Sequence, residues 1–224
     1  DRIDESAKRI LLQKFELGLF EQPYVSPENA KEVVGRKATQ HEADKAQLRS
    51  LVLLQNKNIL PLKKATRVWL YGIKSSEAVR AGFEVVEHPE DAEVAIMRTS
   101  APFEQPHYGY FFGRRHHEGS LAFKPEDDVM KTLDKVSAIV PVIMTMYMER
   151  PAELTDITSK TRAFIANFGL SDEVLFTRLM SVAPYSGRLP FALPSTMKSV
   201  LEQDPSVPGD IKSPLYPTGF GLAH

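Results

Sequence analysis

The sequence predicts a three-layer α/β domain, in which a mostly parallel sheet of six strands lies between two layers of helices. The first observation is the apolar run at residues 141–147, which lacks polar alternation and so suits a strand buried on both faces. Pro141 cannot donate to a sheet ladder, so we place it first in that strand. The second is the helical spacing of apolar residues in 126–136, because a helix followed by a buried strand is the repeating unit of such domains.

The composition excludes several classes of function. Of the 224 residues, 42% are hydrophobic and 25% are charged, which is ordinary for a globular chain. The net charge of −1 gives no electrostatic case for nucleic acid or an anionic membrane as a partner. No apolar run approaches the roughly 20 residues that span a bilayer. Because there is no cysteine, disulfides and thiolate chemistry are excluded, whereas the compartment, cytoplasmic or exported, stays open.

The first 49 residues are predicted to lie outside the sheet and to contain a helix and a helical connector. Residues 3–17 place apolar side chains on one helical stripe, which Gly18 ends. No strand is adjacent to this helix in sequence and the chain does not begin with Met, so we interpret it as a piece of a longer protein. Residues 25–49 are polar with scattered apolar positions, and we expect a helical connector there.

Six short apolar segments are the predicted strands. They span residues 51–54, 67–71, 84–87, 94–97, 141–147 and 163–166. After the first strand, the chain is expected to turn and to run back through residues 59–62. A helix capped at Ser171 and running to Met180 follows the last strand. From residue 181 prolines and turns dominate, so we expect a tail on the surface.

The long segment between the fourth and fifth strands is the candidate functional region. Residues 99–125 show little periodicity, and loops of this length in compact domains are usually functional or disordered. Their many aromatic residues argue against disorder. The segment also leaves the carboxyl end of a strand, where open α/β sheets bind ligands.

Three side chains of this loop are candidates for chemistry. Glu118 precedes a glycine, and a carboxylate on such a loop can be swung into a neighbouring site; the alternative is a solvated loop glutamate. His116 and His117 are adjacent and so diverge in an extended chain. No histidine or acidic partner follows them at helical spacing, so a metal site is not expected.

Charged residues also follow two of the buried strands. Arg98 lies just past the fourth strand, and Glu149 and Arg150 lie just past the fifth. Such charges line a ligand crevice in many α/β sheets. The alternative is that they pair with each other or with loop carboxylates for structural reasons.

Residues 169–173 resemble a nucleophile elbow, the strand-to-helix turn that carries the serine of α/β-hydrolases. That elbow needs a second glycine where Glu173 stands, so Ser171 is better explained as a helix cap. An esterase that uses Ser171 as its nucleophile is the weaker alternative. No glycine-rich phosphate loop follows any strand, which disfavours nucleotide binding, and no cofactor is expected.

Three groups of motifs make the sequence resemble a known family. They are KFELGLF at residues 14–20, LVLLQN at 51–56, and SGRLPF at 186–191 with GFGL at 219–222. In this order, across nearly the whole chain, they resemble the C-terminal part of a glycoside hydrolase family 3 enzyme, such as a β-glucosidase, β-xylosidase or β-N-acetylhexosaminidase. The resemblance implies a retaining glycosidase in which a barrel domain with an aspartate nucleophile precedes a flavodoxin-like α/β sandwich.

The resemblance also implies a division of the chain. Residues 1–24 would be the last helix of the barrel, 25–49 a helical linker, 50–195 the sandwich and 196–224 a tail packed on its surface. The partners would be a carbohydrate substrate and the missing barrel, with a homodimer left open. The chain alone is expected to be inactive.

The family's acid/base carboxylate often lies on a loop near the fourth strand, and Glu118 is the best positional candidate. Here RRHHEG at 114–119 replaces the usual acidic, glycine-rich context, and some branches take the acid/base from the barrel. Arg98, His116 and His117 are the candidates for contacts with sugar hydroxyls. The alternative from another class is a non-catalytic module that braces the barrel and shapes the sugar pocket.

Overall fold

The chain forms two compact units, residues 1–44 and 45–224, in a computed structural model that describes residues 1–204, 206–207 and 209–224. The first unit holds α1 (Arg2–Glu16) and α2 (Pro27–Val33), and α3 (Lys37–Ser50) begins in the first unit and ends in the second. The helices predicted before the sheet are therefore confirmed. That α1 belongs to a barrel domain stays a prediction.

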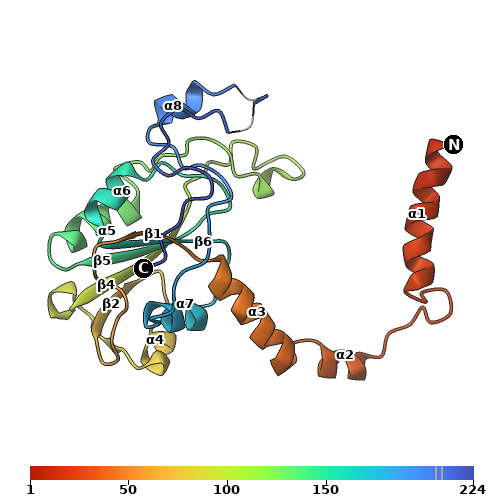
Figure 1. Cartoon of the computed structure of the whole chain (residues 1–224), viewed down its shortest axis with the longest axis horizontal. Coiled ribbons are helices and arrows are strands. Elements are labelled where there is room, and N and C mark those ends of the chain that lie inside the picture. The colour runs from red at the N-terminus through yellow and green to blue at the C-terminus, as the bar shows by residue number, and fades with distance from the viewer. Residues whose placement is uncertain (205, 208) are drawn as a thin grey trace. The chain divides into compact units, whose positions relative to one another are not determined.

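The second unit is built on a six-stranded sheet with the order β1-β6-β5-β4-β2-β3 (Figure 1). The strands are β1 (Val52–Asn56), β2 (Arg67–Tyr71), β3 (Glu84–Val85), β4 (Val94–Ser100), β5 (Val142–Tyr147) and β6 (Ala163–Asn167). β1 pairs with β6 in antiparallel fashion, and the other pairings are parallel. The predicted α/β fold with a mostly parallel sheet is confirmed.

Helices cover both faces of the sheet, which makes three layers (Figure 1). α5 (Asp128–Ser137) and α6 (Thr155–Lys160) pack on one face, and α4 (Ser75–Ala81) and α7 (Asp172–Leu179) pack on the other. β5 shows why its sequence needs no polar alternation: Met144 contributes to the core on the α5 side, whereas Ile143 contributes to the core on the α7 side. Short helices complete the fold: η1 (Pro89–Asp91), η2 (Gly113–Arg115) and α8 (Met197–Leu201).

One predicted strand differs from the structure. Residues 59–62, which follow the first strand, lie outside the sheet, and the N–H of Leu62 donates to the carbonyl of Leu179 at 2.7 Å, at the end of α7. The strand predicted over 84–87 is reduced to the two residues of β3, which lies at the edge of the sheet and pairs with β2 alone.

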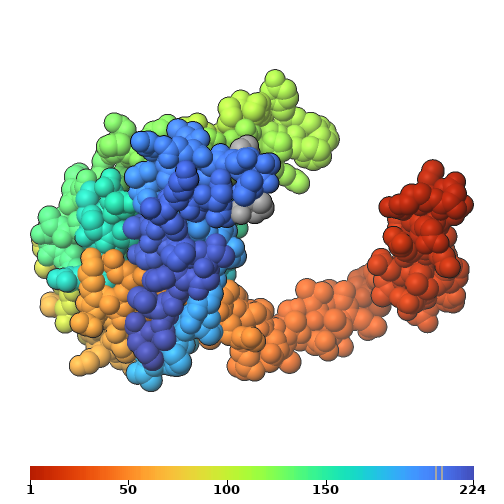
Figure 2. Space-filling view, turned by 45° about the horizontal axis from the view of Figure 1, so that its top comes forward, coloured from red at the N-terminus to blue at the C-terminus, as the bar shows by residue number. Residues whose placement is uncertain are grey.

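The C-terminal segment covers the edge strand β1. Leu222 forms an antiparallel bridge with Leu53, and its N–H donates to the carbonyl of Leu53 at 2.8 Å. Figure 2 shows this segment, in dark blue, lying across the surface of the second unit. Unpaired edge strands invite pairing with other chains, so the segment that the sequence predicts as a surface tail also protects the sheet. The helix α8 within it is not predicted from the sequence.

Candidate functional site

The loop between β4 and α5, residues 101–127, folds back on itself. We call it the β4–α5 loop. Glu104 and Glu118 form an antiparallel bridge in which each N–H donates to the other's carbonyl, both at 2.9 Å. The loop also includes the short helix η2 and projects from the carboxyl edge of the sheet (Figure 1, green). It is therefore an ordered segment in which the backbones of Glu104 and Glu118 lie in register.

Glu118 has histidine partners. Its Oε1 lies 2.8 Å from Nδ1 of His107 and 3.8 Å from Nδ1 of His116, and its side chain is 36% exposed. A carboxyl group that touches imidazole and solvent together can exchange a proton with a bound molecule. His107 is a member of the site that sequence reasoning misses, because it lies 11 residues from Glu118 in an aperiodic segment.

His117 takes a different partner from His116. Its Nδ1 contacts the carboxylate of Glu149, and its ring stacks on Phe103 with the centroids 3.7 Å apart and the planes 10° from parallel. The two adjacent histidines thus contact different carboxylates, as expected for an extended chain. His117 is engaged on two sides, whereas His116, with a side chain 57% exposed, is open to a ligand.

Arg150 binds the backbone of the loop. One of its guanidinium nitrogens donates to the carbonyl of Glu118, and the other donates to the carbonyl of Gly119 at 2.9 Å. The residues after β5 therefore neither pair with each other nor line an empty crevice, as the sequence left open. Glu149 contacts a loop histidine, and Arg150 holds two loop carbonyls.

The second carboxylate of the bridge, Glu104, is paired with a lysine. Nζ of Lys124 lies 3.1 Å from its Oε1, and this hydrogen bond and the attraction of Glu104 raise the pKa of Lys124 above its ordinary value. Gly119 approaches the same carboxylate so closely that a Cβ there would lie 2.5 Å from it. Gly119 also has a φ of +74°, so the turn after Glu118 strongly favours glycine.

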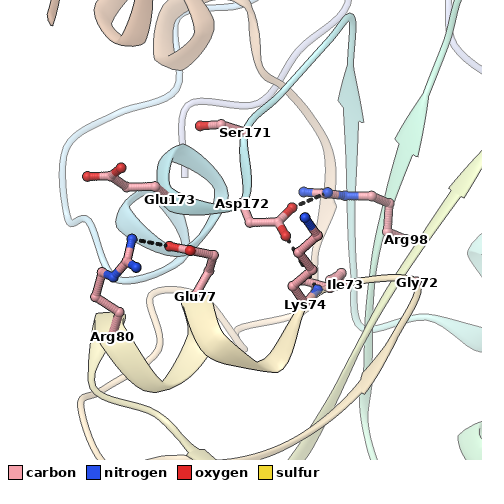
Figure 3. Close-up of a pocket in the computed structure, with 9 residues that line it drawn as sticks. All are labelled: Gly72, Ile73, Lys74, Glu77, Arg80, Arg98, Ser171, Asp172 and Glu173. Carbon is pink, nitrogen blue, oxygen red and sulfur yellow. Dashed lines mark hydrogen bonds and ion pairs between the residues drawn. The ribbon is translucent and has the colours of Figure 1, made fainter. Parts of the chain in front are cut away.

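Arg98 lies in a different environment from the loop histidines. Its guanidinium pairs with Asp172 at the start of α7, and Asp172 also accepts from the N–H of Lys74 at 3.3 Å (Figure 3). These residues line a cavity of about 780 Å³ next to Gly72, between α4 and α7. Its charged lining residues are Lys74, Arg80, Arg98, Glu77, Asp172 and Glu173. Cations and anions are equal in number, so net charge does not select a ligand.

A second cavity, of about 490 Å³, lies between Arg98 and the β4–α5 loop. Three aromatic residues, Tyr71, Phe103 and Phe123, line it together with Arg98 and Asp127. Apolar and aromatic walls with a few polar groups are typical of small-molecule sites. Phe103 stacks on the ring of His117, so the lining of this cavity includes both Arg98 and a residue in contact with a loop histidine.

Ser171 caps α7, which confirms the prediction. Its hydroxyl accepts from the N–H of Val174 at 3.3 Å. Within the described part of the chain, no group of three or more His, Cys, Asp or Glu side chains is arranged to hold a metal ion. The described helices include none that is long and apolar enough to span a membrane.

Removing this cap is expected to destabilise the chain without any effect on chemistry. Ser171→Ala should lower the free energy of unfolding by about 1 kcal/mol, whereas Ser171→Asp should keep most of it because aspartate also accepts from the first turn. Urea unfolding checks the difference. Labelling of Ser171 by a fluorophosphonate would contradict the capping role and revive the esterase alternative.

Among the known proteins that resemble this chain in sequence or in structure are β-glucosidases and a β-glucosidase/β-xylosidase. No family model matches the sequence. The chain is 55% identical over 223 residues to a periplasmic β-glucosidase/β-xylosidase of Dickeya chrysanthemi, covering 100% of this chain and 34% of that protein. It is 37% identical over 228 residues to the probable β-glucosidase C of Aspergillus flavus, covering 100% and 35%. A crystal structure of β-glucosidase from Listeria innocua superposes with a TM-score of 0.73 at 21% identity, covering 99% of this chain and 38% of that one.

Over its whole length the chain is similar to one part of a β-glucosidase/β-xylosidase and of a probable β-glucosidase, and it shares the α/β fold of one part of the Listeria structure. More particularly, the relatives are named as β-glucosidases or a β-xylosidase, which agrees with the resemblance to glycoside hydrolase family 3 seen in the sequence. The chain spans about a third of the length of the curated relatives that it matches, 34% and 35%.

Proposed function

We propose that the complete protein is a retaining glycosidase of β-glucosides or β-xylosides, and that this chain supplies its acid/base carboxylate, Glu118. The observation that supports the proposal is the position of Glu118. It lies on an ordered loop past the carboxyl edge of the sheet, is partly exposed, and has His107 at 2.8 Å. The names of the relatives support the substrate class.

Retention of configuration needs two carboxyl groups about 5 Å apart. In the first step the Glu118 carboxyl gives its proton to the glycosidic oxygen as the bond to the anomeric carbon breaks. A carboxylate from the barrel domain, outside this chain, bonds to that carbon. In the second step the Glu118 carboxylate takes a proton from water, the water oxygen bonds to the anomeric carbon, and the nucleophile is released.

The remaining candidates have supporting roles in this proposal. His107 and His116 keep the Glu118 carboxylate oriented through Nδ1, and exposed His116 also reaches sugar hydroxyls. Arg98, which lines the aromatic cavity while its guanidinium pairs with Asp172, is assigned a contact with the departing group. His117 serves mainly as a support, because Phe103 and Glu149 already occupy its ring and its Nδ1.

Substitution of Glu118 by Gln in the complete protein tests the proposal. Cleavage of substrates with poor leaving groups should collapse, because an amide cannot donate the proton, and an unchanged rate would remove Glu118 from the mechanism.

A second candidate function is a non-catalytic domain that braces the barrel and shapes the sugar pocket. The internal pairing of the candidate side chains favours it: Glu118 contacts His107, His117 contacts Glu149, and Arg98 contacts Asp172. Under this alternative, Glu118→Gln leaves turnover unchanged on substrates with good and with poor leaving groups.

We also propose that residues 1–24 form the last helix of the barrel domain in the complete protein. α1 leaves large apolar side chains exposed, among them Ile10 at 58% and Phe15 at 59%, and a helix with such a face needs a partner. An exported location fits the name of the Dickeya relative, which places that protein in the periplasm.

A further inference from the structure

The segment that follows β5, residues 149–153, lies along residues 117–122 of the β4–α5 loop. Glu149 pairs with His117, and Arg150 donates to the carbonyls of Glu118 and Gly119. The N–H of Glu153 then donates to the carbonyl of Leu121 at 2.8 Å. Residues along the segment 149–153 thus make successive contacts with residues along 117–122 of the loop.

This segment is itself anchored in the core. Met148, just before it, is 1% exposed, and its N–H donates to the carbonyl of Asn167 in β6 at 2.8 Å. Ala152 and Leu154 are fully buried. The loop offers no comparable anchor at its tip, where the side chain of Phe111 is 91% exposed. The segment after β5 therefore ties the backbone of Glu118 to the core, in addition to the bridge to Glu104.

We propose that Arg150 is the positioning residue that holds the loop carboxylates in place for catalysis; the inference rests on the proposed function of Glu118. Arg150 contacts the backbone carbonyls rather than the Glu118 carboxylate, so it acts through the position of the loop. The carbonyl of Glu118 accepts from both Arg150 and the N–H of Glu104, so one guanidinium group braces the backbone bridge between Glu104 and Glu118.

The chemistry of arginine suits this task. Its planar fork can donate to two carbonyls in fixed directions, whereas the ammonium of lysine is a single point donor. Without the Arg150 guanidinium, the side-chain contacts left at the Glu104–Glu118 bridge would be those of Glu104 with its lysine and of Glu118 with its two histidines. A misplacement of a reacting group by about 1 Å can cost roughly 10²-fold in rate.

The experiment compares Arg150→Ala, Arg150→Lys and the control Arg115→Ala in the complete protein. Arg115 lies in η2 on the same loop and is exposed, so its removal changes the charge equally. Two quantities are measured: hydrogen exchange of the Glu104 and Glu118 amides, which report the bridge, and the steady-state constants for a glycoside with a poor leaving group. Guanidinium ion is then added to the Arg150→Ala protein.

We expect both amides to exchange about tenfold faster or more in Arg150→Ala, and kcat to fall roughly 10²-fold while KM changes little. Added guanidinium should restore part of kcat, and Arg150→Lys should lie in between, whereas Arg115→Ala should match wild type in both measurements. If Arg150→Ala does not fold, Arg150→Lys, which keeps the charge and the stem, decides by the same measurements.

The outcomes separate the two proposals. Faster exchange with unchanged kcat would overturn the role of Arg150 in catalysis and leave it a structural brace of the loop, whereas the role of Glu118 is decided separately by Glu118→Gln. Unchanged exchange, with or without a loss of kcat, would overturn the positioning role of Arg150.

Discussion

In the complete protein, Glu118→Gln is expected to lower kcat/KM about 10²- to 10⁴-fold on alkyl glycosides, because the amide cannot protonate the departing oxygen. On aryl glycosides whose phenol leaves without protonation, kcat/KM should stay close to wild type. Azide should raise the turnover of these activated substrates, since it attacks the glycosyl intermediate without a base. The measurement is a series of kcat/KM values against the pKa of the leaving group.

The matched control is Glu104→Gln. Glu104 lies opposite Glu118 in the same backbone bridge, but its carboxylate is held by Lys124 at 3.1 Å. Its substitution should leave the dependence on the leaving group as in wild type. If Glu104→Gln showed that dependence and Glu118→Gln did not, the proton donor would be Glu104. If neither variant showed it, the non-catalytic alternative would stand.

The second large effect is expected in the core. Phe164 lies in β6, between β1 and β5, and is fully buried. Phe164→Ala should lower the free energy of unfolding by about 3–5 kcal/mol, because it removes buried surface and leaves a cavity. Phe111→Ala makes the same chemical change at a side chain that is 91% exposed, and should have little effect. Urea unfolding followed by circular dichroism measures both, and equal losses would contradict the assigned core.

The sheet could be predicted from the sequence because burial on both faces leaves a local signature. β4, β5 and β6 appear as short apolar runs, and α5 shows the spacing of Val129, Met130 and Leu133 that the structure buries. The weak prediction, β3, failed in length because an edge strand of two residues has little signature of its own. The helix α8 was missed since it is five residues long.

Two of the motifs that carry the resemblance have structural reasons. In SGRLPF, a Cβ on Gly187 would lie 2.3 Å from the carbonyl oxygen of Leu51. Only glycine therefore fits at this position without a steric clash. In GFGL, Leu222 forms the bridge to Leu53 that closes the sheet edge. These two motifs are thus needed for packing around β1. They indicate the fold of the chain and say nothing about which residues take part in catalysis.

The candidate site could be predicted only in part. The loop and Glu118 follow from an aperiodic, aromatic segment past a buried strand, yet their partners do not. His117 and Glu149 are 32 residues apart, and Arg98 and Asp172 are 74 apart. No periodic pattern connects such pairs, because the order of strands and helices in the fold brings them together.

The most direct test of the account is a crystal structure of the complete protein with a sugar bound. We predict that the carboxyl group of Glu118 reaches the glycosidic oxygen and lies about 5–5.5 Å from a nucleophilic aspartate of the barrel. A structure in which Glu118 faces solvent, while another carboxyl group stands at that distance from the nucleophile, would contradict it.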